Sequence, residues 1–582
     1  MLSTAIYSQD YNEERLPMKK AIPYIITLLL ILVLGGAFCK LYFDHYMYTN
    51  KRADLDTYYG VQGKDDFPVI YENLVSEMRA RRFGEACYMD LDKVRTLLNK
   101  RFYYGSKDQV LIYCLPEEKI FAKAGKKQWE SDVNGVTKEE YAPLVVDGDT
   151  PYVALDFVRK FTNFYFGVHT NPNRVVLRNK WGTEKMATVK GSTNMRTLGG
   201  VKAPIVASVE EGTDVLVLED LDDWIRIETA DGFYGYVESK YLSEIREQKL
   251  EPVTDVPEME PQFRKVDGRA SIAWNVTSYK ESNDSIDGML VGTKGIKVLA
   301  PTWFTLVSDD GEVNCKASSS YVKKAHKQGM QVWGVLDNFQ NDQGIVCSAF
   351  LETLESRSGV IDEVISKAKD YKLDGINVDI EGLGETHGED FVEFVREISI
   401  ACRRAGLIIS INNYVPYNFN DYYDLLEQGT FADYIIIMGY DEHFAGSEEA
   451  GSVASIGYVE YGIQEALKEV PADRLINAIP FYTRGWTTKG TSVSSVVLDM
   501  VEAKTFVEEH KMKEEWNSTA GQYYAEKKSG KKLYQIWRED KKSVETKLEV
   551  MEKYGLAGVA VWRLGLETND VWDEIEDYVN GK

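Results

Sequence analysis

The stretch Asp374-Gly-Ile-Asn-Val-Asp-Ile-Glu381 decides how the carboxyl-terminal half of this chain is interpreted. Gly375–Glu381 is a run of strand length, and side chains alternate between the two faces of a strand. Asn377, Asp379 and Glu381 therefore share one face, while the isoleucines and the valine between them occupy the other. We expect three polar side chains to converge on one side of this strand.

The surrounding sequence places this strand in a barrel. From about residue 263 onward, apolar segments of strand length alternate eight times with segments of helical period, which is typical of parallel βα units. The predicted strands are Ala270–Trp274, Val298–Phe304, Gln331–Leu336, Gly375–Glu381, Ile408–Asn412, Tyr434–Tyr440, Leu475–Phe481 and Gly558–Leu564. They predict a (β/α)8 TIM barrel over 263–582, with an inserted subdomain in the long interval between the last two strands.

Barrel topology also predicts where the chemistry lies. Functional side chains of such barrels lie at the carboxyl ends of the strands, where Asp379 and Glu381 are found. The alternative, an edge strand with a solvated polar face, fits poorly because the strands of a closed barrel have no free edge.

The motif Asp-Gly-x-x-x-Asp-x-Glu resembles the signature of family-18 glycoside hydrolases. The resemblance covers roughly 265–582 and extends through Met438-Gly-Tyr-Asp441, Pro480-Phe-Tyr-Thr-Arg-Gly-Trp486 and Trp562. One departure is Asn377, which stands where many chitinases have an aspartate that helps to hold the middle aspartate. An asparagine can donate the same hydrogen bond without titrating.

The resemblance implies a role for each matching residue. Glu381 is expected to be the general acid, Asp379 to orient the 2-acetamido group of the substrate, and Tyr440 to hydrogen-bond that group. This retaining, substrate-assisted route needs no separate nucleophile. The implied substrate-binding residues are Asp374, Asn377, Met438, Asp441, Arg484 and Trp562, although Arg484 fits a structural ion pair nearly as well. No cofactor is implied.

Local sequence narrows the substrate. Pro301–Phe304, Tyr440–Gly446, Ile536–Asp540 and Val561–Gly565 resemble the bacterial branch that includes spore-cortex and other peptidoglycan N-acetylglucosaminidases. An N-acetylglucosamine-containing glycan, with peptidoglycan favoured, is the expected partner. Two alternatives stay open: a chitinase or an endo-N-acetylglucosaminidase acting on other glycans, and an inactive glycan-binding wall protein.

The amino-terminal region contains an uncharged run, 21–39, of about the length needed to cross a bilayer as a helix. We expect a cytoplasmic tail, 1–20, one transmembrane anchor, and a stalk, 40–84, with the following domains outside the cell. A cleaved signal peptide fits less well because the apolar run exceeds the usual 7–15 residues and no Ala-x-Ala site follows. A buried core helix is the other alternative.

Two small domains are expected between the stalk and the barrel. Tyr88–Arg95 and Tyr152–Arg159 are similar in sequence, which predicts an α+β repeat domain, 85–182, resembling the amino-terminal module of copper amine oxidase without its copper. Short strands over 186–246 resemble a bacterial SH3-like domain, which either binds the cell wall or acts as a spacer. A proline-containing acidic linker, 247–262, follows.

Composition excludes several classes of protein. The 582 residues are 44% hydrophobic and 27% charged, which excludes a mostly disordered chain. The net charge of −24 disfavours a nucleic-acid partner, because phosphate backbones are repelled. The six cysteines and six histidines are scattered without the spacing of a disulfide framework or a metal site.

Overall fold

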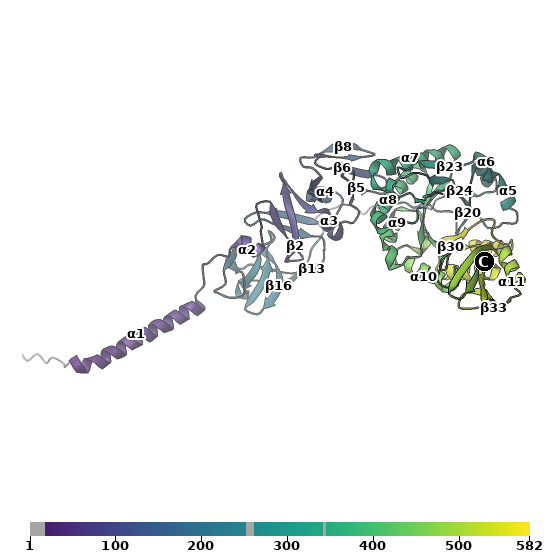
Figure 1. Ribbon diagram of the computed structural model, residues 1–582. Helices are drawn as coiled ribbons and strands as arrows, with labels where there is room; N and C mark the ends of the chain where they lie inside the picture. Colours follow the sequence, from purple (N-terminus) through teal and green to yellow (C-terminus); the bar gives the residue numbers. More distant parts are fainter. Residues whose placement is uncertain (1–17, 252–255, 257–260, 341–344) are drawn as a thin grey trace, which may run out of the picture. The chain divides into compact units, whose positions relative to one another are not determined.

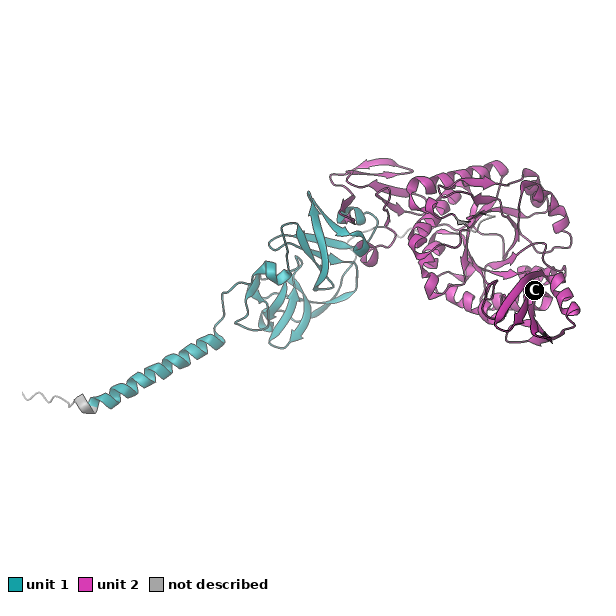
Figure 2. Ribbon diagram, in the orientation of Figure 1, with its two compact units in different colours: residues 1–93, 155–256 teal, residues 94–154, 257–582 magenta. Residues whose placement is uncertain are grey.

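The computed structural model describes residues 18–251, 256, 261–340 and 345–582 (Figure 1). The chain forms two compact units (Figure 2). Unit 1 consists of Met1–Lys93 and Leu155–Val256, and unit 2 consists of Val94–Ala154 and Pro257–Lys582. Parts of the expected tail, 1–20, and of the expected linker, 247–262, lie outside the described residues.

Unit 2 contains the predicted parallel barrel of eight strands. The strands are β20 (Ala270–Asn275), β21 (Val298–Pro301), β24 (Gln331–Asp337), β27 (Gly375–Asp379), β28 (Ile408–Tyr414), β29 (Tyr434–Met438), β30 (Leu475–Pro480) and β36 (Gly558–Trp562). Each pairs in parallel with its neighbours, and the pairing of β21 with β24 closes the ring. The (β/α)8 prediction is confirmed.

Helices surround the barrel. These helices are α5 (Ile286–Met289), α6 (Ser319–Lys327), α7 (Leu354–Tyr371), α8 (Gly388–Ala405), α9 (Leu425–Phe431), α10 (Ile456–Ala466), α12 (Lys541–Lys553) and α13 (Val571–Asn580). Alternation of side chains along the strands separates two apolar cores. Ile376 and Val378 pack outward with the helices, whereas Trp333 and Val335 fill the barrel interior. Helix α8 ends at Gly406, whose φ of 77° suits a residue without a side chain.

The predicted insertion between the last two barrel strands is also confirmed. It contains β31 (Tyr482–Lys489), β32 (Ser492–Asp499), α11 (Met500–Glu509), β33 (Lys513–Asn517), β34 (Gln522–Ser529) and β35 (Lys532–Arg538). These strands form one sheet in the order β32-β31-β35-β34-β33. The predicted strand Val298–Phe304 is interrupted, because β21 ends at Pro301 and a separate strand, β22 (Phe304–Leu306), pairs with β23 (Val313–Cys315).

A small antiparallel sheet from an earlier part of the chain also belongs to unit 2. Its strands are β4 (Tyr103–Gly105), β5 (Val110–Cys114), β6 (Lys119–Lys123), β7 (Gln128–Ser131) and β8 (Gly135–Lys138), paired in chain order. The stretch expected to be one repeat domain, 85–182, is thus divided between the two units.

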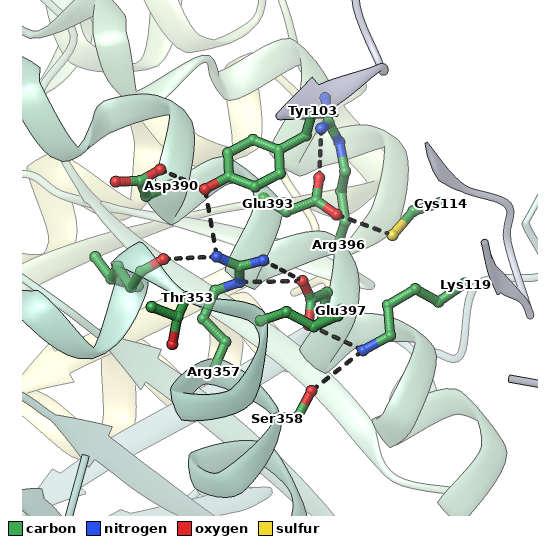
Figure 3. A network of polar contacts seen from close by, with 12 residues as sticks. Tyr103, Cys114, Lys119, Thr353, Arg357, Ser358, Asp390, Glu393, Arg396 and Glu397 are labelled. Carbon is green, nitrogen blue, oxygen red and sulfur yellow. Dashed lines mark hydrogen bonds and ion pairs between the residues drawn. The ribbon is translucent and has the colours of Figure 1, made fainter. Parts of the chain in front are cut away.

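Buried charges join this small sheet to α7 and α8 (Figure 3). The Arg357 guanidinium donates to Glu397 Oε1 at 3.0 and 2.9 Å, and both side chains are almost fully buried. Lys119 Nζ from β6 donates to the other oxygen of Glu397 at 3.1 Å. Arg357 also lies near the Tyr103 ring of β4, whose hydroxyl donates to Asp390 at 2.5 Å. The small sheet is therefore part of the packing of the barrel helices.

Unit 1 contains a second sheet. In it β11 (Tyr165–His169), β12 (Arg174–Arg178), β1 (Asp66–Tyr71), β2 (Leu74–Phe83) and β3 (Ala86–Asp90) are consecutive neighbours. Residues 66–83 were expected to be stalk, but they contribute two of these strands. The parallel partner of β1 is β12, about 100 residues further along the chain, so local periodicity gives no sign of this pairing.

Unit 1 also contains a seven-stranded sheet and one long helix. The strands of this sheet are β13 (Thr183–Thr188), β14 (Thr193–Arg196), β15 (Ile205–Val209), β16 (Asp214–Leu221), β17 (Trp224–Glu228), β18 (Tyr234–Glu238) and β19 (Arg246–Lys249). They pair in the order β15-β14-β18-β17-β16-β13-β19. Helix α1 (Met18–Tyr46) contains an apolar stretch, Ala21–Tyr46, within which an 18-residue window has a mean hydropathy of 2.4 and is not buried. Its length and composition fit a membrane span, and a signal sequence fits the same description.

Candidate active site

A cavity of about 450 Å³ opens at the carboxyl ends of the barrel strands. Six predicted site residues line it: Asp379, Glu381, Met438, Tyr440, Asp441 and Trp562. They come from the ends of β27, β29 and β36 or directly follow them. The remaining wall is formed by Asn412, Tyr414, Val415, Tyr417, Phe419, Asn420, Phe444 and Tyr458.

Strand alternation does not position Glu381, because β27 ends at Asp379. The amide side chain of Asn338, the residue after β24, holds the Glu381 backbone instead. Asn338 Oδ1 accepts from the Glu381 N–H at 2.9 Å, and its Nδ2 donates to the Glu381 carbonyl at 2.9 Å. Asn338 is fully buried, so this pair of hydrogen bonds fixes the position of the Glu381 backbone, from which the carboxyl side chain extends.

Asp379 is held by Asn412, from the end of β28. Asn412 Nδ2 donates to Asp379 Oδ1 at 2.9 Å. The expected direct bond from Asn377 to Asp379 is not formed, because Asn377 donates its two amide hydrogens to Ser410 Oγ and Asn412 Oδ1, each at 2.8 Å. Its oxygen accepts from the Trp274 indole N–H at 2.9 Å, which fixes the orientation of the amide.

The two carboxyls differ in proton affinity. Burial raises the pKa of Asp379 to about 6, and the hydrogen bond from Asn412 opposes this rise. Burial, followed by the charge of Asp379, raises the pKa of Glu381 to about 8, with the Tyr414 hydroxyl acting in the opposite direction. Near neutral pH the site therefore holds one ionised carboxylate beside one protonated acid, as acid–base chemistry requires.

Tyr440 lies beside the carboxyl pair, and Tyr482 holds the neighbouring Asp441. Tyr440 follows β29, and burial, followed by the charge of Asp379, raises its pKa well above the ordinary value, so its hydroxyl keeps its proton. Tyr482 donates to Asp441 Oδ1 at 2.5 Å. This bond ties Asp441, which has a φ of 59°, to the first residue of the inserted sheet.

Aromatic side chains form the mouth of the cavity. The rings of Tyr417 and Phe419 are stacked with their centroids 5.5 Å apart and an angle of 10° between their planes. The ring of Tyr461 also stacks on Tyr417, with a centroid distance of 5.0 Å. Phe419 is 77% exposed and Phe444 is 54% exposed, although both line the cavity. Exposed ring faces at a cavity mouth suit the apolar faces of sugar rings.

A second hollow of about 310 Å³ adjoins the cavity and shares Tyr414, Tyr417 and Asn420 with it. Its other lining includes four acids: Asp421, Asp424, Glu465 and Glu469. The route away from the carboxyl pair is therefore both aromatic and acidic.

Three expected binding residues do not line the cavity: Asn377, which lies in the buried polar cluster described above, Asp374 and Arg484. Asp374 precedes β27 and so lies at the opposite end of the strand, roughly 16 Å of extended chain from Asp379. It accepts from the Val332 N–H of β24 at 2.8 Å and lies 2.8 Å from Nε2 of His326 on α6. Arg484 lies on β31 outside the cavity lining and donates to Ser495 Oγ at 3.0 Å.

Sequence reasoning missed Asn338, Asn412, Tyr414 and the aromatic mouth. The same strand-end rule that selected Asp379 could have found the first three, because each lies at or just past a strand end. Within the described residues, no group of three or more His, Cys, Asp or Glu side chains is arranged to hold a metal ion.

Two parts of the chain match known families. Residues 299–567 match glycosyl hydrolases family 18, and residues 191–243 match the bacterial SH3 domain. The first match covers most of the barrel and its insertion, and the second lies within the seven-stranded sheet of unit 1.

Curated relatives share the barrel region. An uncharacterized glycosylase, YvbX, of Bacillus subtilis is 28% identical over 279 residues, which are 46% of this chain and 80% of that protein. The cortical fragment-lytic enzyme of Bacillus subtilis is 24% identical over 239 residues, or 39% of this chain and 54% of that enzyme, so the match spans about half its length. The spore cortex-lytic enzyme SleL of Bacillus cereus has 20% identity and a TM-score of 0.48, covering 57% of this chain and 77% of that structure.

Proposed function

Because residues 299–567 form a family-18 glycosyl hydrolase domain and residues 191–243 form a bacterial SH3 domain, we propose that this chain is a surface-held glycosidase that cleaves peptidoglycan. The bond cleaved is the β-linkage that follows N-acetylglucosamine. Cleavage proceeds with retention of configuration through assistance by the acetamido group of the substrate.

The observation that carries this proposal is the pairing of Asp379 with Glu381 in one buried cavity. The raised pKa of Glu381, about 8, keeps a proton available for the glycosidic oxygen at neutral pH. Asp379, whose pKa is about 6, is then ionised and can stabilise positive charge on the reacting sugar. Two carboxyls held in different protonation states are what general acid catalysis beside a charged intermediate requires.

The remaining cavity residues have roles that fit this route. Asp379 orients the 2-acetamido group so that its carbonyl oxygen attacks the anomeric carbon while Glu381 protonates the leaving oxygen. Tyr440 donates a hydrogen bond from its hydroxyl to that acetamido group, and its strongly raised pKa keeps the hydroxyl protonated. Trp562, at the end of β36, supplies a ring face beneath the sugar. In the second half of the reaction Glu381 accepts a proton from water, which opens the cyclic intermediate.

Peptidoglycan is favoured by the acidic hollow beside the cavity. The peptides of wall glycan carry amino groups, and carboxylates such as Asp421 and Glu469 attract such cations. The relatives named as cortical fragment-lytic enzymes support the same substrate class. The SH3 domain adds a second point of attachment to the wall.

Chitin is the second candidate, and the aromatic mouth favours it. The stack of Phe419, Tyr417 and Tyr461 offers ring faces to an unsubstituted sugar chain. A peptide-free polymer makes more use of this stack and less use of the acidic hollow.

The apolar helix α1 supports a location at the membrane. Ala21–Tyr46 is long enough to span the bilayer, and we place residues 1–20 in the cytoplasm and the remaining domains outside. The enzyme then acts on the wall while it is anchored in the membrane.

The test is digestion of purified peptidoglycan and of chitin oligosaccharides by the full chain in detergent, with mass spectrometry of the new reducing ends. We expect N-acetylglucosamine at the new reducing end of peptidoglycan, in the β-configuration before mutarotation. A reducing end of N-acetylmuramic acid contradicts the assigned bond, and faster cleavage of chitin selects the second candidate.

A further inference from the structure

A third buried carboxyl lies beside the catalytic pair. Asp337 is the last residue of β24, and the parallel register of β24 with β27 pairs it directly with Asp379. Paired residues of neighbouring parallel strands point to the same face, so both carboxyls are directed to the barrel interior. Asp337 is 7% exposed and Asp379 is 8% exposed.

The contacts of Asp337 keep it in place. Thr305 Oγ1 donates to its Oδ2 at 3.2 Å, and the Phe339 N–H donates to its Oδ1 at 3.3 Å. Lys316, itself 6% exposed, donates to the Thr277 carbonyl at 3.0 Å. Its ammonium is close enough to Asp337 for each to favour the charged form of the other.

The charges in this region are coupled. Burial, followed by the charge of Asp379, raises the pKa of Asp337 to about 7, and Lys316 opposes the rise. Burial, then the charges of Asp379 and Asp441, raise the pKa of Glu381, and the charge of Asp337 adds a smaller rise. Three buried carboxyls cannot all be ionised at low cost, so their protons leave in separate steps.

We propose that Asp337 is a positioning residue of the catalytic pair: its buried carboxyl, set beside Asp379 by strand register, keeps the proton on Glu381 as the pH rises. It acts through charge, because the cavity lining does not include it. Asn377, which lies two residues before Asp379 on the same face of β27, cannot act in this way, because its amide does not titrate and both amide hydrogens are already donated. The inference rests on the proposed function, since it assigns Glu381 as the acid.

The order of titration gives the proposal a direction. Asp379 loses its proton first, near pH 6, when Asp337 is still mostly neutral. Asp337 is ionised by the time Glu381 loses its proton near pH 8. Removal of the Asp337 charge therefore lowers the upper limit of the active pH range and leaves the lower limit nearly unchanged.

The test is the pH profile of glycan turnover by the full chain with Asp337→Asn. We expect the basic limb to move to lower pH by about one unit and the acid limb to stay. Asp310→Asn, which removes an exposed carboxylate from the turn between β22 and β23, is the matched control and should move neither limb. Loss of activity in Asp337→Asn without a shift of the basic limb contradicts the proposal and leaves Asp337 a structural role.

A second measurement does not depend on turnover. Infrared difference titration should give three transitions, near pH 6, 7 and 8, among the carboxyl bands that Asp379→Asn, Asp337→Asn and Glu381→Gln remove, whereas other buried carboxyls such as Glu393 keep their bands in all three variants. Asp337→Asn should remove the middle transition and lower the highest, which Glu381→Gln assigns. A Glu381 transition that stays at the wild-type pH in Asp337→Asn, or in Asp337→Ser where the first variant does not fold, overturns the inference. If no glycan is cleaved, the proposed function fails, and this titration still decides whether Asp337 acts on Glu381.

Discussion

Asn412 Nδ2 lies 2.9 Å from Asp379 Oδ1 and 3.2 Å from Asn377 Oδ1. One amide therefore links the proposed catalytic carboxylate to the buried polar cluster beneath it. Asn377 influences Asp379 only through this intermediary, because both of its own hydrogens are donated to Ser410 and Asn412.

Replacement of Asn412 by Leu should move the acid limb of the pH profile to higher pH. The hydrogen bond from Asn412 favours the ionised form of Asp379, so its loss raises the pKa of Asp379 above about 6. The measurement is turnover of one glycan as a function of pH. Asn413→Leu is the matched control: Asn413 bonds to Gln428 at 2.8 and 3.0 Å, so this change should cost stability without moving the acid limb. An unmoved limb in Asn412→Leu would show that the bond has no role in tuning Asp379.

Glu381→Gln should lower turnover by about two to four orders of magnitude, because it removes the transferable proton and little else. Binding of insoluble wall glycan and the melting temperature should stay close to the wild-type values. Glu385→Gln, four residues further along and exposed, is the control and should remain active. Wild-type turnover by Glu381→Gln would exclude Glu381 as the acid.

Phe419→Ala should raise the KM for polymeric glycan by about tenfold and leave kcat nearly unchanged. Phe419 is 77% exposed, so its loss removes a stacking face without opening the core. The kinetics should be measured on long and short oligosaccharides, and only the long ones should show the effect. Leu426→Ala, which removes an exposed apolar side chain on α9 outside the cavity, is the control. An equal loss on the shortest cleavable substrate would contradict a role at the cavity mouth.

Glu397→Leu should destabilise unit 2 by about 3–5 kcal/mol, because it leaves Arg357 buried without its partner. Thermal and urea unfolding measure the change. Glu515→Leu breaks the exposed pair with Lys513 and should leave the unfolding transition where it is in the wild type. The double change Arg357→Met with Glu397→Leu should recover much of the loss, and a failure to recover would mean that packing of the two helices matters more than the unpaired charge.

The chain should remain in the membrane fraction after washing with high salt. Ala21–Tyr46 has the length and hydropathy of a span, and its insertion does not depend on surface charge. A chain that starts at Met47 should be soluble. Amino-terminal sequencing of a mature form that begins near Lys40 would contradict an uncleaved anchor, and resistance of the barrel to protease in wall-stripped cells would contradict the orientation.

The barrel could be predicted because its strands are local apolar runs between helical segments. The sequence placed Asp379 at the carboxyl end of a strand, and it is the last residue of β27. The same motif also selected Asp374, which the structure places at the opposite end of the strand. A motif gives residue types in order, and only the direction of the strand says which of them reach the cavity.

Other parts of the molecule depend on contacts between distant residues. The hold of Asn338 on Glu381 joins residues 43 positions apart, and local pattern carries no trace of it. The pairing of β1 with β12, which converts an expected stalk into sheet, has the same origin. The packing of β4 to β6 on α7 and α8 likewise depends on partners more than 200 positions away.

The chain enters unit 2 at Val94, leaves it after Ala154 and returns at Pro257. A single proteolytic cut between the seven-stranded sheet and the barrel would therefore not shed the hydrolase. The amino-terminal fragment would still carry the small sheet, whose Lys119 and Tyr103 are bonded to Glu397 and Asp390 of the other fragment. Release of the enzyme as a free soluble fragment requires a second cut within 94–154 or the dissociation of that sheet from the helices.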